Sequence, residues 1–279
     1  MTAPSRIKLK SGLELFCINP VEAAYLADEA DAYFRHGISL QKGARVLDVG
    51  ANVGVFSARV FEQLEGEVEI FAFEPLPPIH AVLDRNANEV LGRKVKVFPH
   101  GIAAKEAELE FAYFPLLTGW SSMCLRTSDL KAETERQTNA FVELIREGRI
   151  APELKRLPSY ILKALVKIRV GAVLKRRETH RARVRPLSIV IEEQGIAVID
   201  LLKIDVEGAE LEVLKSIEDA HWPRIQQAVI EVEQWSARRE PIGELLESKG
   251  FRVEIEHDSV QQAADIGMIY AVRSVHQRQ

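Results

Sequence analysis

Two short stretches of this 279-residue chain end an apolar run in an acidic residue followed by a glycine. Residues 46–56 read VLDVGANVGVF, and residues 201–210 read LLKIDVEGAE. Glycine lets a backbone come close to a ligand because it has no Cβ, and the free N–H groups where a helix starts favour a carboxylate or phosphate. A structural core needs neither feature. The two stretches therefore predict a small-molecule site at the ends of two buried strands.

The first stretch discriminates between two kinds of nucleotide ligand. A dinucleotide site has the pattern G-x-G-x-x-G. Here Gly50 and Gly54 are present, but Asn52 stands where the middle glycine would be, which leaves poor access for a pyrophosphate. Glu74 ends the next predicted strand, about 20 residues further on, where a carboxylate can accept hydrogen bonds from ribose hydroxyls. These residues predict a site for a ribose joined to something smaller than a pyrophosphate.

The second stretch carries groups that could act on a substrate. Asp205 ends the strand, and Gly208 frees the turn into the next helix. Glu207 and Glu210 fall in the first turn of that helix, where the helix dipole also favours acidic residues as simple caps. Lys203 lies two residues before Asp205 and points to the same face of the strand, so the two are predicted to pair.

Metal and histidine chemistry remain open as alternatives. Glu231 and Glu233 end a later strand, and Asp205 with Glu231 could bind a divalent ion, because carboxylates bind magnesium. No His or Cys spacing predicts a soft-metal site. His257 and His180 could each reach the cleft as a base, although a lone histidine is more often structural.

Strands and helices alternate along most of the chain, which would bring these residues together. The predicted strands are residues 45–50, 68–75, 95–102, 107–114, 198–205, 227–233, 251–257 and 266–273. The predicted helices are residues 55–64, 78–91, 209–217 and 242–250. This alternation indicates an α/β domain with a doubly wound, mostly parallel, Rossmann-like sheet. The last two strands leave no room for a helix between them, which predicts an antiparallel hairpin at one edge.

Two segments depart from the alternation, within what we expect to be a single domain over residues 1–279. Residues 1–43 form a lead-in, with a hairpin in 8–18 and a helix in 20–37. Residues 116–182 sit where a short connection would suffice, and a structureless loop of that length is rare in a compact domain. Helical patterns at 130–147 and 158–177 therefore predict a helical insertion or lid.

The composition is that of an ordinary globular protein. Hydrophobic residues make up 47% of the chain and charged residues 28%. The net charge of −4 means that the chain lacks the overall positive charge typical of nucleic-acid-binding proteins, so no nucleic-acid partner is expected. Two cysteines, Cys17 and Cys124, make neither a disulfide framework nor a metal cage. No apolar run is long enough for a transmembrane segment, and no secretory signal is visible, so a cytoplasmic location is expected.

Four motifs together carry a resemblance to a known family. The segments VLDVGANVGVFS, AFEPLPP, FPHGIAAKEAELEF and IDLLKIDVEGAELEVLKS resemble those of FkbM-type methyltransferases. These are class I S-adenosylmethionine-dependent enzymes, mostly O-methyltransferases of secondary metabolism and glycans. The resemblance covers roughly residues 12–115 and 183–273, and it leaves the insertion out.

The resemblance implies a role for each motif. The Gly50–Gly54 loop with Asp48 would hold the methionine part of the cofactor, Glu74 would bind the ribose hydroxyls, and His100 with the two residues after it would lie against the adenine. The implied cofactor-binding residues are Asp48, Gly50, Ala51, Asn52, Gly54, Phe56, Glu74, Pro75, Gly101, Ile102 and Asp205. The implied catalytic residues are Asp205, Glu207 and Lys203, with no metal ligand among them.

Other residues near these motifs are interpreted as structural. Tyr25, Tyr33 and Phe34 in the lead-in helix are predicted to belong to the core rather than to a cofactor lid. Asn86 and Asn88 are predicted to be helix-surface or capping residues.

The expected activity is methyl transfer from S-adenosylmethionine to a hydroxyl of a small metabolite, a glycan or a carrier-bound intermediate. Positioning supplies much of the rate of such a displacement, and a base assists an alcohol nucleophile. A carboxyl acceptor is a weaker alternative, and a bound divalent metal is possible but not expected. The rivals are an NAD-type oxidoreductase, a non-catalytic binding module on the same fold, and an RNA methyltransferase that only the local basic cluster supports.

The basic stretch at residues 155–185 leaves two interpretations open. Its basic residues include Lys163, Lys167, Lys175, Arg176, Arg177, Arg181, Arg183 and Arg185. The insertion could be an extra helical layer with a solvated basic edge. It could instead be a lid that recruits an acidic carrier protein, an anionic substrate or an anionic membrane surface.

Overall fold

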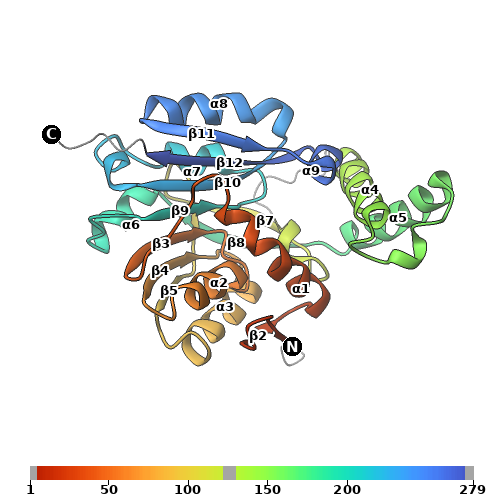
Figure 1. Ribbon diagram of the computed structural model, residues 1–279, viewed down its shortest axis with the longest axis horizontal. Coiled ribbons are helices and arrows are strands. Elements are labelled where there is room, and N and C mark those ends of the chain that lie inside the picture. Colours follow the sequence, from red (N-terminus) through yellow and green to blue (C-terminus); the bar gives the residue numbers. More distant parts are fainter. Residues whose placement is uncertain (1–4, 122–129, 274–279) are drawn as a thin grey trace.

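Seven strands form the central sheet of the computed structural model, which describes residues 5–121 and 130–273. Their bounds are β3 Ala44–Val49, β4 Val68–Phe73, β5 Val95–Phe98, β9 Leu201–Ile204, β10 Gln227–Glu233, β11 Phe251–Glu256 and β12 Ile266–Arg273. They lie in the order β11-β12-β10-β9-β3-β4-β5 (Figure 1), and β12 runs antiparallel to the other six strands. The chain order reverses between β3 and β9, which is where open α/β sheets bind ligands.

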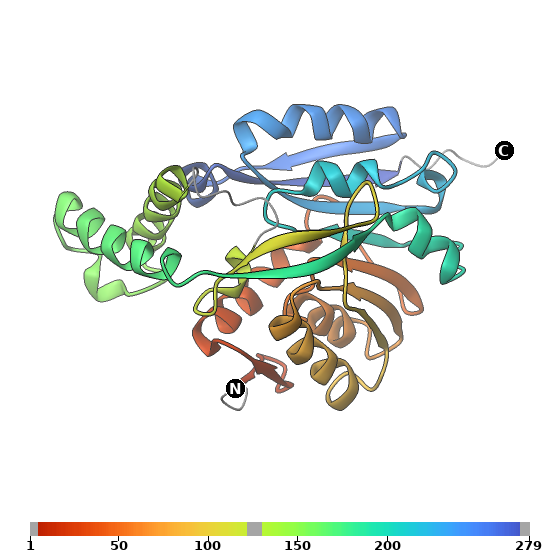
Figure 2. The same cartoon turned by 180° about the vertical axis from the view of Figure 1, so that it is seen from behind.

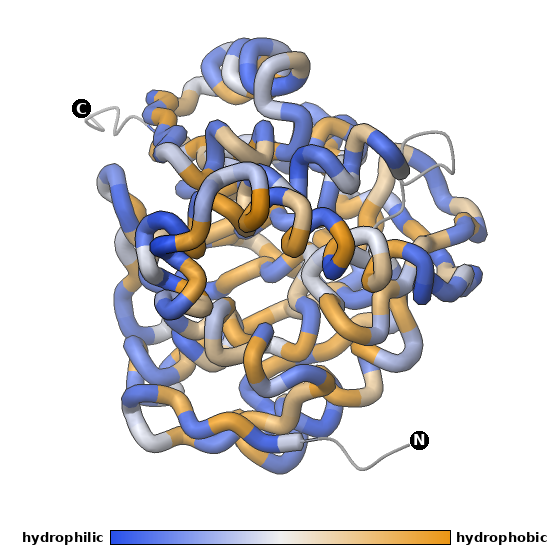
Figure 3. Tube along the Cα trace, turned by 90° about the vertical axis from the view of Figure 1, so that its right-hand side faces the viewer, coloured by the Kyte–Doolittle hydropathy of each residue, from blue (hydrophilic) through white to orange (hydrophobic). Residues whose placement is uncertain are grey.

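Helices cover both faces of this sheet. Their bounds are α2 Val55–Gln63, α3 Pro77–Glu89, α6 Leu187–Glu193, α7 Glu210–Lys215 and α8 Trp235–Ser248, with the short 3-10 helix η5 Trp222–Arg224. The central strands are apolar on both sides: Val46 packs with α2 and α3, whereas its neighbour Leu47 packs with α6, α7 and α8. Figure 3 shows the hydrophobic segments gathered in the interior and the hydrophilic ones at the periphery. The predicted fold class is confirmed.

The edge of the sheet differs from the prediction in one detail. Strands β11 and β12 are antiparallel as expected, but the six-residue helix α9, Ser259–Ala264, lies between them. Asp258 caps α9 with its side chain and forms a capping box with Gln261. The prediction that no helix fits there was wrong, because one capped turn and a half requires only six residues.

The predicted insertion contains two long helices and part of a second sheet. Helices α4, Leu130–Glu147, and α5, Ser159–Leu174, pack on each other and project from the body beside α9 (Figure 1). The 3-10 helices η2, Thr118–Trp120, and η4, Pro152–Leu154, flank them. Part of the predicted range, including Cys124, lies outside the described residues.

The last residues of the predicted insertion form a strand rather than a helix. Strand β8, Glu178–Arg185, pairs with β7, Ala107–Tyr113, and with the two-residue strand β6, Gly101–Ile102. Ala182 and Val184 are buried while Arg181 and Arg183 face solvent, which is the alternation of a half-buried strand. Figure 2 shows this ribbon leading out to α5.

The lead-in folds onto the body as a hairpin and a helix. Strands β1, Ser5–Lys8, and β2, Glu14–Cys17, are antiparallel, as predicted. Helix α1, Pro20–Glu29, begins at Asn19, whose side chain accepts hydrogen bonds from two backbone N–H groups. It continues as the 3-10 helix η1, Ala30–Phe34. Among the described residues, no helix is long and apolar enough to cross a membrane.

Candidate active site

A cavity of about 450 Å³ lies where β3, β4, β9 and β10 end. Helix α1, η1, η2 and α4 contribute its other walls. The predicted site residues that line it are Gly50, Ala51, Asn52, Phe56, Glu74, Pro75, Gly101, Ile102, Lys203, Asp205 and Glu207. Residues from four separate stretches of sequence therefore share one cavity, because parallel strands end at the same edge of a sheet.

Several predicted residues lie outside the cavity lining. Asp48 is fully buried behind it, and Gly54 forms the N-cap of α2. His100 is buried against Phe98 and is not among the lining residues. Neither His180 nor His257, the two histidines considered as bases, lines the cavity.

The loop after β3 approaches the end of β9 very closely. Gly50 has a φ of +82°, and a Cβ added there would lie 1.7 Å from the carbonyl oxygen of Asp205. No side chain fits this contact, so Gly50 keeps the two strand ends together. Asn52 has a φ of +49°, and its side-chain oxygen accepts a hydrogen bond of 2.7 Å from the N–H of Val53.

A buried lysine ties these two strand ends together electrostatically. Lys203 Nζ lies 3.1 Å from Asp48 Oδ1 and 3.4 Å from Asp205 Oδ2, as strand alternation predicts for the second pair. It also donates a hydrogen bond of 2.8 Å to the carbonyl of Gly50. Burial alone would lower the pKa of Lys203, but the two carboxylates outweigh it and raise the pKa above its usual value. Lys203 is therefore a fixed positive charge.

Glu74 presents a buried carboxyl group to the cavity from the end of β4. One of its oxygens accepts a hydrogen bond of 2.9 Å from the N–H of Leu76. Burial raises the pKa of Glu74 to about 7, although backbone N–H groups of Leu76 and Asn52 partly offset that rise. The carboxyl group is thus held in place and keeps capacity for hydrogen bonds with a ligand.

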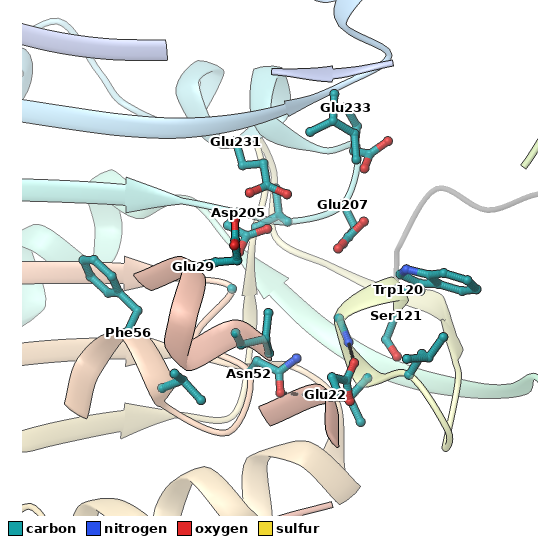
Figure 4. Close-up of a pocket in the computed structure, with 18 of the residues that line it drawn as sticks. Glu22, Glu29, Asn52, Phe56, Trp120, Ser121, Asp205, Glu207, Glu231 and Glu233 are labelled. Carbon is teal, nitrogen blue, oxygen red and sulfur yellow. Dashed lines mark hydrogen bonds between the residues drawn. The ribbon is translucent and has the colours of Figure 1, made fainter. Parts of the chain in front are cut away.

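Four acidic side chains gather at the other end of the cavity, and we call Asp205, Glu207, Glu231 and Glu233 the carboxylate cluster. Figure 4 shows them together, across from Asn52. The hydroxyl of Tyr33 donates to Asp205 at 3.0 Å and also lies 3.4 Å from Glu231. Glu207 has a φ of +53°, an uncommon conformation for a residue other than glycine.

Burial and mutual repulsion alter the acidity of this cluster. The pKa values of Glu207 and Glu231 are raised well above their ordinary value, first by burial and then by the neighbouring carboxylates. The same causes raise the pKa of Glu233 to about 8. An acid with a pKa of about 8, such as Glu233, can exchange protons near neutral pH, as a general base or acid must. Among the described residues, no group of three or more His, Cys, Asp or Glu side chains is arranged to hold a metal ion.

The comparison with protein families decides what kind of domain this is. Residues 48–253, which include every strand end described above, match the sequence model of the methyltransferase FkbM domain. The chain belongs to the FkbM methyltransferase family. The resemblance stated from the motifs is therefore confirmed.

This FkbM-family chain is also similar in sequence to individual curated proteins and in fold to a solved structure. It is 34% identical over 278 residues to the AMB antimetabolite synthetase AmbE of Pseudomonas aeruginosa, covering 96% of this chain but 12% of that protein. It is 32% identical to the 31-O-demethyl-FK506 methyltransferase FkbM of Streptomyces tacrolimicus, covering 96% of both chains. An FkbM methyltransferase structure from Methylobacillus flagellatus shares the fold, with a TM-score of 0.50 and 14% identity over 90% of this chain and 51% of that one.

Sequence reasoning missed a second wall of this FkbM-family cavity. The carboxylate of Glu22 in α1 accepts hydrogen bonds from the Gly119 N–H at 2.7 Å and the Thr118 hydroxyl at 3.0 Å. The Thr118 hydroxyl also lies 3.1 Å from Asn52 Oδ1, and Trp120 lines the same wall. These residues come from the lead-in and the insertion, where no motif marks them.

Two side chains interpreted as structural have other roles. Tyr33, predicted to be core, lines the cavity, as Tyr25 also does, and its hydroxyl contacts the carboxylate cluster. Asn86, predicted to be at a helix surface, is fully buried, donates to the carbonyls of Phe16 and Val53, and accepts from the Phe16 N–H. It therefore fastens the N-terminal hairpin to the loop after β3. Asn88 is exposed and donates to the carbonyl of Asp84, as a helix-surface residue does.

Proposed function

We propose that this FkbM-family protein is an O-methyltransferase that methylates a hydroxyl of a small metabolite, a glycan or a carrier-bound intermediate, with S-adenosylmethionine as methyl donor. One observation carries the proposal: a nucleoside-binding set and a cluster of acids face each other across one cavity. The name of the relative from Streptomyces tacrolimicus, a 31-O-demethyl-FK506 methyltransferase, supports oxygen as the atom methylated.

The chemistry of the lining residues fits the donor. Glu74 offers a carboxyl group for the ribose hydroxyls, and Pro75, Gly101 and Ile102 offer an apolar surface for the adenine. The loop of Gly50 to Asn52 leads to the start of α2, whose first N–H groups have no side-chain cap and suit a carboxylate. When bound, S-adenosylmethionine supplies a methyl group on a positively charged sulfur, already activated for displacement.

The residues at the end of β9 and just after it would have different roles in the reaction. Glu207 would act as the general base that takes the proton of the acceptor hydroxyl. Asp205 would be a positioning residue, because Lys203 and the Tyr33 hydroxyl hold its carboxylate from two sides. Lys203 would position the loop after β3 through its bond to Gly50 and would not itself exchange a proton.

A carrier-bound acceptor would need a docking surface, and α5 offers one. Its exposed apolar stripe consists of Tyr160, Ala164, Leu165, Ile168 and Ala172. Arg169, Lys175 and Arg176 lie beside the stripe and form no ion pair with another described residue, whereas Lys163 and Lys167 pair with Glu135. An acidic carrier protein would complement both the apolar stripe and these cations. Similarity to part of a synthetase supports this partner.

Calorimetric titration of S-adenosylhomocysteine tests the cofactor assignment. We expect micromolar binding to the wild type and at least a tenfold loss in Glu74→Gln, because a carboxylate accepts hydrogen bonds with both oxygens, whereas one of the two positions of an amide is a donor NH2 group. Glu244→Gln makes the same change at an exposed glutamate on α8 and should bind like the wild type. Preferential binding of NAD, titrated in parallel, would replace the proposal with the oxidoreductase alternative.

A further inference from the structure

One oxygen of Glu233 is buried without a hydrogen-bond partner. The side chain lines the cavity and is 9% exposed, and its Oε1 contacts no donor among the described residues. A buried, unsatisfied carboxylate oxygen is costly to the fold. Its position in the cavity wall indicates that a ligand donor completes it.

The cations near Glu233 already have carboxylate partners. Lys203 pairs with Asp48 and Asp205, Arg136 pairs with Glu133, and Arg238 pairs with Glu210. Within residues 5–121 and 130–273, neither Glu231 nor Glu233 forms an ion pair. The wall at the end of β10 therefore carries an excess of acidic groups over basic ones.

Glu231 and Glu233 lie apart from the residues beside β3 and β4 that are proposed to bind the cofactor. Glu231 and Glu233 are two residues apart on β10, so they face the same side, while Val232 between them packs in the opposite core. Strand β10 is the second neighbour of β3, which places it about 10 Å away. A group held at β10 would belong to the acceptor rather than to the donor bound beside β3 and β4.

We propose that the acceptor carries a primary amino group, positively charged at neutral pH, which Glu231 and Glu233 bind at the end of β10. This inference rests on the proposed function and names the class of substrate. A hydroxyl would satisfy one oxygen but would leave the repulsion between the carboxylates unchanged. An ammonium group brings three N–H donors and a full positive charge, and a quaternary ammonium would bring the charge without a donor.

Binding of this amino group would also favour the deprotonated form of Glu207, the proposed general base. The acids that face Glu233 are Glu207 in the loop after β9, Glu210 at the start of α7, Glu231 on β10 and Glu133 on α4, with Arg136 as the facing cation. A positive charge placed among them lowers the pKa values of the cluster, including that of Glu207. Glu207 would then lose its proton when the correct acceptor is present.

Titration with two matched probes tests this inference. Benzylammonium and benzyl alcohol have nearly the same shape and differ in charge and donors. Each is titrated into the protein of residues 1–279 saturated with S-adenosylhomocysteine. We expect benzylammonium to bind the wild type at least tenfold more tightly than benzyl alcohol. Glu233→Gln should reduce that preference below threefold and keep the affinity for S-adenosylhomocysteine within twofold, and Glu244→Gln should keep both.

Three results would overturn the inference. They are equal binding of both probes to the wild type, an unchanged preference in both Glu233→Gln and Glu231→Gln, and saturable binding of Mg²⁺ that displaces benzylammonium. If S-adenosylhomocysteine does not bind, the proposed function fails, but the same pair of probes titrated without it still decides whether the cavity selects an amine. Circular dichroism of each variant identifies a loss of binding that comes from unfolding.

Discussion

At the scale of residues, a few atomic contacts determine the geometry where β3 and β9 end. The contact between Gly50 and the carbonyl of Asp205 leaves no room for a side chain, and Lys203 joins the same two strand ends through three polar contacts. At the other end, the buried glutamates of β10 repel one another, because, besides burial, the charge of Glu233 raises the pKa of Glu231. Individual substitutions should therefore separate the two ends of the site.

Gly50→Ala should lower both stability and cofactor affinity. The new Cβ meets the carbonyl of Asp205, so the loop after β3 must move, and the affinity for S-adenosylhomocysteine should fall at least tenfold. Gly43→Ala is the matched control, because Gly43 also has a positive φ but has no atom within 4 Å of an added Cβ. It should cost about 1–3 kcal/mol in stability and keep the affinity. Equal loss of affinity in both variants would refute the argument from close approach.

Glu233 should make the fold less stable as pH rises from about 5 to about 9. Its folded pKa of about 8 lies above the ordinary value, so the folded state holds a proton that the unfolded chain has lost. The free energy of unfolding falls in this window, and the stability is fully present below pH 4.5. Glu207, Glu210, Glu231 and Glu133 share this environment with the cation Arg136, so part of the slope should remain without Glu233.

Thermal melts over this pH range measure the effect of Glu233→Gln. Near pH 9 the variant should melt about 3 °C or more above the wild type, and near pH 4 the two should melt alike, because glutamine stays neutral. Glu244→Gln should follow the wild-type curve. A Glu233→Gln curve parallel to the wild type at every pH would contradict the assignment.

At the scale of elements, the two faces of α5 have different surroundings. Leu162, Val166 and Val170 pack into the small core shared with α4, whereas Ile168 and Leu165 face away from it. The helix thus keeps one apolar face for packing and leaves a second apolar face exposed, which is the surface proposed for an acidic carrier.

Ile168→Asp should weaken carrier binding without affecting the rest of the molecule. Its side chain is 70% exposed, so melting temperature and affinity for S-adenosylhomocysteine should not change. Its affinity for a purified acidic holo acyl carrier protein, followed by calorimetry, should fall at least tenfold because the change adds negative charge to the stripe. Leu162→Ala should instead cost about 2–4 kcal/mol. Unchanged carrier affinity, or a loss seen only with anionic vesicles, would reject the carrier proposal.

At the scale of the whole molecule, the cavity is built from the sheet, the lead-in and the insertion together. Hydrogen–deuterium exchange should therefore slow in all three when S-adenosylhomocysteine binds. We expect protection in residues 50–56, in residues 74–76, in η1 and in η2, because each of these segments lines the cavity. Residues 243–248 of α8 lie outside the cavity and should exchange at an unchanged rate. Protection restricted to residues 50–56 and 74–76 would mean that the lead-in takes no part in the site.

The sequence by itself determined the order of most strands and helices, the family, and the strand ends from which the site is built. Local patterns carry this information, because apolar runs end at Gly50, Glu74 and Asp205. Each end is recognisable in the sequence because a hydrophobic core does not require an acidic residue or a glycine. The lead-in hairpin and the helix at residues 130–147 were predicted for the same reason.

Only the tertiary structure decided which other residues join the cavity. Tyr33, Glu22 and Thr118 come from separate segments, and nothing in their own neighbourhood distinguishes them from core or surface residues. Strand β8 and helix α9 were missed because pairing with distant β7 and one short capped turn override a weak local pattern. The unsatisfied oxygen of Glu233 is likewise invisible in sequence, since burial and hydrogen bonding depend on what the whole chain packs around a side chain.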